Sequence, residues 1–162
     1  MKKLDKKAVW LFFLQYVWSF VYLGAFVVAI TLSALDGEIS VMAVLNLIGW
    51  VLLTVLLVSY FVSHLAYKFY LYELSDIGFK KESGIIWKQY VTIPYDRIQN
   101  VDIYRGVLAR ILGLSDLQIH TAGVGGVAMG EGRLPGLSMA DAEVMRDELI
   151  NRSRQSRSGQ GL

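Results

Sequence analysis

Two long uncharged runs near the start of the chain, residues 9–35 and 39–67, constrain the fold more than any other feature. A helix needs about 20 consecutive apolar residues to cross the hydrocarbon core of a bilayer, and each run is longer than that. A cleaved signal peptide is the alternative for the first run, but its apolar region would extend over only about 7–15 residues. The runs are separated by Asp36-Gly37-Glu38 alone. Together they predict a hairpin of two membrane-spanning helices over residues 9–67.

The charges around these runs predict the orientation of the hairpin. Lys68 follows the second run, and the connection between the runs contains only Asp36 and Glu38 as charged residues. Lysine and arginine concentrate on the cytoplasmic side of a membrane protein. The pattern predicts a multi-pass protein of the inner (cytoplasmic) membrane with both termini in the cytoplasm. Residues 1–8 would form a basic cytoplasmic leader, which contains Lys2, Lys3, Lys6 and Lys7.

Small residues recur at a spacing of four in both runs. This spacing lets helix backbones approach one another closely. Two interpretations stay open, namely packing of the two spans against each other and an interface with further copies of the chain. No ionisable residue lies deep in either run, which argues against a transporter or channel. The candidate packing residues are Ala25, Ala29 and Ser33 in the first span and Ser59 and Ser63 in the second.

After residue 67 the pattern changes to short segments with a period near two, separated by turn residues, which predicts β-strands. The fold class is therefore a membrane α-helical hairpin followed by an α+β, mostly β domain over residues 68–152. A helix is expected from Ser138, because Ser138 can cap it and Asp141 complements its dipole. The composition of residues 153–162 predicts a flexible tail. The expected strands are residues 67–74, 79–83, 85–93, 98–104, 117–121, 127–129 and 133–134.

Several motifs of this domain follow one another in a characteristic order. They are Tyr72-Glu73-Leu74-Ser75-Asp76-Ile77-Gly78-Phe79, Gly84-Ile85-Ile86-Trp87, Ile93-Pro94-Tyr95-Asp96-Arg97-Ile98-Gln99-Asn100-Val101, Gly113-Leu114-Ser115-Asp116-Leu117-Gln118-Ile119 and Leu134-Pro135-Gly136-Leu137. Together they resemble the bacterial pleckstrin-homology (PH) domains of the YdbS type over residues 67–152, and two preceding spans are typical of that family. The resemblance implies a PH-like barrel of about seven antiparallel strands with a C-terminal helix at one end. It implies no catalytic residues and assigns no ligand.

The residue types argue against several kinds of chemistry. The chain has no cysteine, which excludes disulfides, a thiolate nucleophile and cysteine metal sites. Residues 123–128 fit a dinucleotide-binding pattern only formally, because the glycines and the proline that follow prevent the helix that such a site needs. His120 has no second histidine in the domain with which to bind a metal. Basic and acidic residues are nearly balanced, unlike in a nucleic-acid binder. We therefore expect no enzymatic activity, no metal, no cofactor and no nucleic-acid partner.

Two surfaces remain as functional candidates. The main hypothesis is an interaction or scaffolding module at the cytoplasmic face, which contacts another membrane protein or forms a homo-oligomer. An amphipathic turn closed by Gly113 supplies its candidate contacts, Val107, Leu108, Ile111 and Leu112. The alternative is sensing of anionic lipid headgroups, which attract basic residues close to the membrane surface. Its candidates are Lys80, Lys81, Lys88 and Arg97. In both cases the lipid bilayer is a partner.

Overall fold

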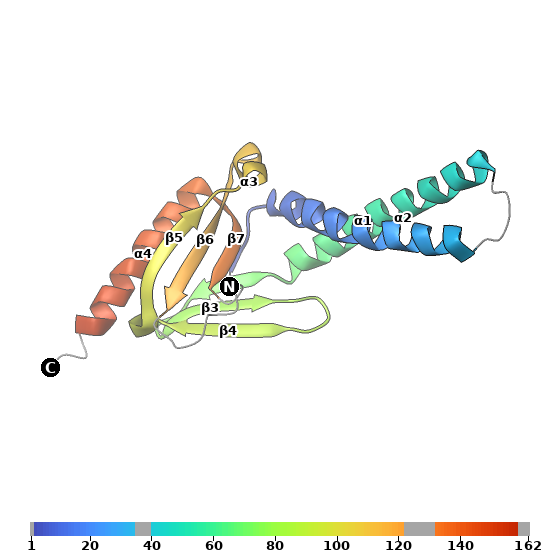
Figure 1. The fold of residues 1–162 in the computed structure, drawn as a ribbon. Helices are drawn as coiled ribbons and strands as arrows, with labels where there is room; N and C mark the ends of the chain where they lie inside the picture. The colour runs from blue at the N-terminus through green and yellow to red at the C-terminus, as the bar shows by residue number, and fades with distance from the viewer. Residues whose placement is uncertain (1, 35–39, 122–131, 159–162) are drawn as a thin grey trace. The chain divides into compact units, whose positions relative to one another are not determined.

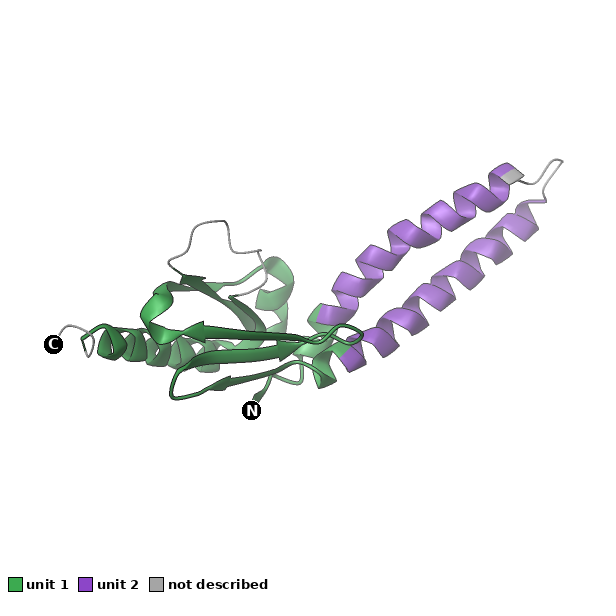
Figure 2. Ribbon diagram, turned by 90° about the horizontal axis from the view of Figure 1, so that it is seen from below, with its two compact units in different colours: residues 1–11, 66–162 green, residues 12–65 purple. Residues whose placement is uncertain are grey.

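The computed structural model describes residues 2–34, 40–121 and 132–158 of the 162-residue chain (Figure 1). The chain forms two compact units (Figure 2). The helical unit contains residues 12–65, and the β unit contains residues 1–11 and 66–162. The β unit therefore includes the leader, the first turn of the first long helix and the last residues of the second.

The two predicted spans are helices. α1 covers Ala8–Ala34 and α2 covers Val41–Lys68. Both are long and apolar enough to cross a membrane, and only 6% of the residues in their most apolar windows are buried by protein. A core helix of a water-soluble protein would be mostly buried. The outward-facing apolar surface therefore agrees with a lipid surrounding.

Within the helical unit, α1 approaches α2 closely at Gly24. A Cβ atom built on Gly24 would lie 2.9 Å from Cγ1 of Val51, so the absence of a side chain permits this approach. Ser59 and Ser63 of α2 are fully buried, as expected of packing residues. The small residues predicted on α1 are exposed rather than packed in this hairpin, and their role in an oligomer interface stays a prediction. They are Ala25, Ala29 and Ser33.

The described strands of the β unit are all antiparallel and form two sheets. Sheet A has the order β1 (Lys2–Lys3), β2 (Leu71–Leu74), β3 (Gly78–Ser83) and β4 (Gln89–Pro94). Sheet B has the order β5 (Ile98–Tyr104), β6 (Leu114–Thr121) and β7 (Arg133–Ser138). The predicted antiparallel β domain is confirmed. Among the described strands, no ladder joins the two sheets into a closed ring.

Helices connect and cover the sheets. The short 3-10 helix η1 (Tyr95–Arg97) joins β4 to β5, and α3 (Val107–Leu112) joins β5 to β6. The C-terminal helix α4 (Met139–Ser158) packs against β5 and η1 (Figure 1). Its cap is the predicted one, since the Asp141 amide donates a 3.1 Å hydrogen bond to Oγ of Ser138. The core between these layers is made of fully buried side chains such as Phe79, Leu117, Leu134 and Leu149.

The leader is part of sheet A rather than a separate basic segment. Lys2 and Lys3 pair with Tyr72 and Leu71 of β2, and the side chain of Leu4 is buried. The Asp5 amide donates a 3.2 Å hydrogen bond to the carbonyl of Gly136 on β7. The sequence analysis did not predict β1 because two residues are too few to show the alternation of polar and apolar side chains that indicates a strand. In the fold it covers an edge of β2 that would otherwise be open.

The other differences from the expected elements lie at their ends. α4 continues to Ser158, so residues 153–158 are helical and the predicted flexible tail is wrong there. The reason is tertiary, because buried Ser153 donates a 3.0 Å hydrogen bond to the carbonyl of Ile98, which also accepts one from Arg157. β4 begins at Gln89 instead of residue 85, and β6 begins at Leu114 instead of residue 117. The predicted strand at residues 127–129 lies outside the described residues.

Candidate interaction surfaces

α3 carries an exposed apolar face. The helix is fixed at its C-terminal end by Gly113, whose left-handed conformation (φ 72°) closes the turn as the sequence predicted. Ala109 is buried, while Val107, Leu108 and Ile111 are 64%, 47% and 75% exposed. Leu112, the fourth predicted contact residue, is half-buried. The helix thus buries Ala109 and part of Leu112, and it leaves three large apolar side chains exposed.

The four predicted headgroup-contact residues do not share one face. Lys80 and Lys81 are neighbours on β3, so they point to opposite sides of sheet A. Lys88 precedes β4 and Arg97 follows it, and the six residues of that strand separate them by about 20 Å of extended chain. Arg97 is exposed, whereas Lys88 forms a 2.9 Å ion pair with Glu82.

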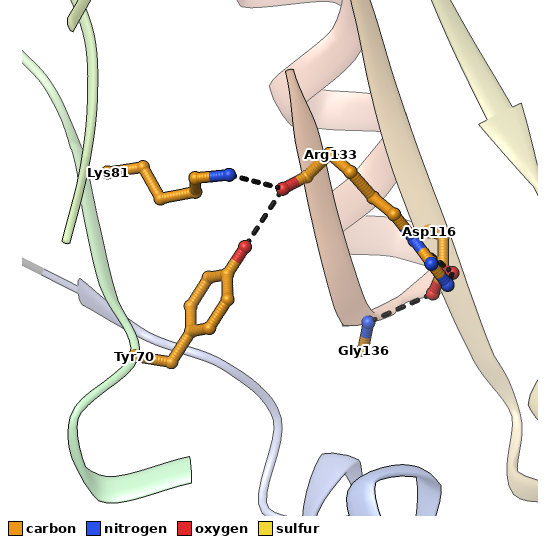
Figure 3. A network of polar contacts seen from close by, with 5 residues as sticks. All are labelled: Tyr70, Lys81, Asp116, Arg133 and Gly136. Atoms are coloured by element: carbon orange, nitrogen blue, oxygen red, sulfur yellow. Dashed lines mark hydrogen bonds and ion pairs between the residues drawn. The ribbon is translucent and has the colours of Figure 1, made fainter. Parts of the chain in front are cut away.

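Lys81 must be removed from the predicted cationic surface. Its side chain is only 5% exposed, and its Nζ donates a 3.3 Å hydrogen bond to the carbonyl of Arg133 (Figure 3). A buried ammonium group that donates to the backbone is not available to a lipid headgroup. The residue instead helps to hold sheet A against β7.

A polar junction between the sheets surrounds this contact. The Tyr70 hydroxyl donates a 2.8 Å hydrogen bond to the same Arg133 carbonyl (Figure 3). The Arg133 guanidinium pairs with Asp116, and that carboxylate also accepts a 3.2 Å hydrogen bond from the Gly136 amide. Burial raises the pKa of Tyr70 well above its ordinary value of 10.0, so the hydroxyl stays protonated and a donor even where a solvated tyrosine would ionise. Period-two reading of the strands did not reveal this junction, because its partners are distant in sequence.

The outer face of sheet B contains a polar hollow of about 890 Å³. His120 lies in it and pairs with Asp102 on the neighbouring strand, with 3.2 Å between Nε2 and Oδ2. The register pairs Asn100 with His120, so Asp102 lies two residues further along β5, diagonally across from His120. Among the described residues, no three His, Asp or Glu side chains gather as metal ligands. The hollow mixes basic, acidic and amide groups and does not define one ligand.

Comparisons with known proteins agree with this architecture. The family model described as "Bacterial PH domain" matches residues 11–153. The UPF0699 transmembrane protein YdbT of Bacillus subtilis (strain 168) is 32% identical over 89 residues, which cover 55% of this chain and 18% of the Bacillus protein. No solved structure matches the chain. Because the family model extends across both apolar helices and nearly all of the β unit, the chain belongs to the bacterial PH domain family, as a membrane-associated member.

Proposed function

We propose that this chain is a membrane-anchored interaction module that assembles with another membrane protein chain, in the first instance a second copy of itself. The observation that carries the proposal is the apolar face of α3, where Val107, Leu108 and Ile111 are exposed on a helix fixed by Gly113. Exposed apolar side chains on a fixed element favour burial against a partner. The outward-facing small residues of α1 support the same assembly within the bilayer, because they leave room for a second helix.

Protein contact accounts for these surfaces better than headgroup sensing does. A headgroup site needs several basic side chains that converge on one anion. Here Lys81 is buried, Lys88 is paired with Glu82, and Arg97 lies at the other end of β4. The proposal contains no catalytic step.

A relative that is named a transmembrane protein supports the membrane anchoring of this module. The matched region makes up 18% of that Bacillus protein, so there the module is joined to much more chain.

We propose that the β unit lies in the cytoplasm, at the inner (cytoplasmic) membrane. The lysines that flank the outer ends of the two helices support this orientation; they are Lys2, Lys3, Lys6, Lys7 and Lys68.

Cysteine cross-linking in native membranes tests the proposal, because the chain has no cysteine of its own. Ile111→Cys in the full chain should give a cross-linked product with a short thiol-reactive reagent. Val144→Cys is the matched control, because Val144 is 71% exposed on α4 and lies outside the proposed surface. Adding Leu108→Asp should weaken the Ile111→Cys product, since a carboxylate at this interface would lose its hydration.

The mass of the cross-linked product identifies the partner as a second copy or another membrane protein. If Ile111→Cys gives no more product than Val144→Cys, the proposed role of α3 is wrong.

A further inference from the structure

The loop between β3 and β4 carries the two most exposed large apolar side chains among the described residues. Ile86 is 81% exposed and Trp87 is 85% exposed. Tyr90, which follows on β4, is 68% exposed. Single exposed apolar residues are common on protein surfaces, but adjacent Ile and Trp side chains at a hairpin tip form a continuous apolar projection.

The backbone of this tip is fixed by a glycine. Gly84 has φ 110°, a conformation that other residues rarely adopt. A Cβ atom at Gly84 would lie 1.9 Å from the carbonyl oxygen of Trp87. The chain therefore turns back on itself tightly after the last strand pair, Ser83 with Gln89. Ile86 and Trp87 lie within this turn, between the paired residues Ser83 and Gln89.

The tip lies next to the place where α2 ends. Nζ of Lys88 is 5.8 Å from the ring centre of Phe69, the residue that follows the end of α2 at Lys68. The Tyr67 hydroxyl in the last turn of α2 donates a 3.2 Å hydrogen bond to the carbonyl of Leu4 in the leader. All of these residues belong to the β unit, and in both views the tip of the β3–β4 hairpin lies beside the end of α2 (Figures 1 and 2).

We propose that Ile86 and Trp87 insert into the interfacial layer of the bilayer that holds α1 and α2. Tryptophan is enriched where a protein meets the headgroup region, because its ring is apolar and its N–H remains hydrated. Lys68, in the last turn of α2, matches the anionic surface of a cytoplasmic leaflet. The partner of this apolar tip is thus a lipid surface. Insertion gives the β unit a direct contact with the membrane, in addition to the two points at which the chain passes into the helical unit.

Fluorescence quenching of the full chain in liposomes that contain anionic lipid tests this inference. An environment-sensitive dye is attached to the cysteine of the Ile86→Cys variant, which retains Trp87. The control is the Val144→Cys variant labelled with the same dye. A nitroxide-labelled lipid should quench the dye at position 86 and leave that at position 144 unaffected. Aqueous iodide should quench the dye at position 86 severalfold less efficiently than that at position 144. Because Ile86 is 81% exposed, this substitution removes no core contact.

Two outcomes would overturn the inference. The first is equal quenching by iodide at positions 86 and 144. The second is protection at position 86 that disappears when the protein is diluted in lipid, because the tip would then be covered by another copy. Replacing Trp87 by Ser in the labelled variant should increase iodide access if the ring drives insertion. None of these readouts depends on cross-linking at Ile111, so this inference and the proposed function fail separately.

Discussion

At Gly136 the start of the chain and sheet B approach one another closely. It has φ 69°, and a Cβ atom on it would lie 2.5 Å from Cβ of Ala8. Its carbonyl accepts the hydrogen bond from Asp5, and its amide donates to Asp116. One glycine therefore joins the leader, β6 and β7, and a side chain there would disturb all three.

We expect Gly136→Ala to destabilise the β unit by about 1–3 kcal/mol, through backbone strain and the clash with Ala8. Hydrogen exchange of the strand amides in the full chain measures this change. Gly106→Ala is the matched control, because Gly106 has φ −66° and a Cβ atom there would meet nothing within 4 Å. The double variant Ala8→Gly/Gly136→Ala should recover the clash component only. Equal effects at positions 106 and 136 would contradict this account.

Tyr70 gives the β unit a dependence on alkaline pH. Burial raises the pKa of Tyr70 above the ordinary value of 10.0, so the folded chain keeps a proton that the unfolded chain releases. The associated stability is complete below pH 10 and decreases as the pH rises through the interval between the two values. We expect Tyr70→Phe to make stability above pH 10 less pH-dependent than in the wild type. Denaturant unfolding at a series of alkaline pH values checks this, and parallel curves would argue against it.

At the scale of elements, we expect the leader to stabilise sheet A through the buried side chain of Leu4. Leu4 is 4% exposed, and Leu4→Ala is expected to cost about 2–5 kcal/mol through the lost contacts and the cavity left behind. Amides of β2 should then exchange faster. Lys3→Gln, at the exposed position of β1 that precedes Leu4, should leave that exchange unchanged. Unaltered protection of β2 in Leu4→Ala would mean that the leader does not support the sheet.

The sequence predicts an element best when its signal is local. α1 and α2 follow from the length of their apolar runs, α3 from its closing glycine, and the start of α4 from Ser138. The leader strand and the last turns of α4 depend on partners elsewhere in the chain. Ser153 and Arg157 donate hydrogen bonds to the carbonyl of Ile98, and no sequence pattern within residues 153–158 indicates these contacts.

The candidate surfaces were predictable to different degrees for the same reason. The apolar residues of α3 repeat at helical spacing, so their exposed face could be anticipated. Alternation places Lys80 and Lys81 on opposite faces of β3, but it does not say which face is buried. A lysine can occupy the inner face when its long side chain carries the ammonium group to an acceptor, which here is the carbonyl of Arg133.

At the scale of the whole molecule, the proposed orientation makes a direct prediction. A cysteine placed at Asp36 should react with a membrane-impermeant thiol reagent added to intact cells. Val144→Cys should react only after the membrane is opened, because the β unit would lie in the cytoplasm. Labelling of Val144→Cys in intact cells would show that the β unit lies outside the cytoplasm and that the proposed orientation is wrong. The protein has no native cysteine, so each signal comes from one site.

The pairing of Lys2 with Tyr72 has a consequence for biogenesis. During synthesis the ribosome delivers β1 before either transmembrane segment, and the strand it pairs with emerges only after both. Sheet A therefore reaches its final form once the hairpin has been translated, with β1 docking onto a newly made neighbour.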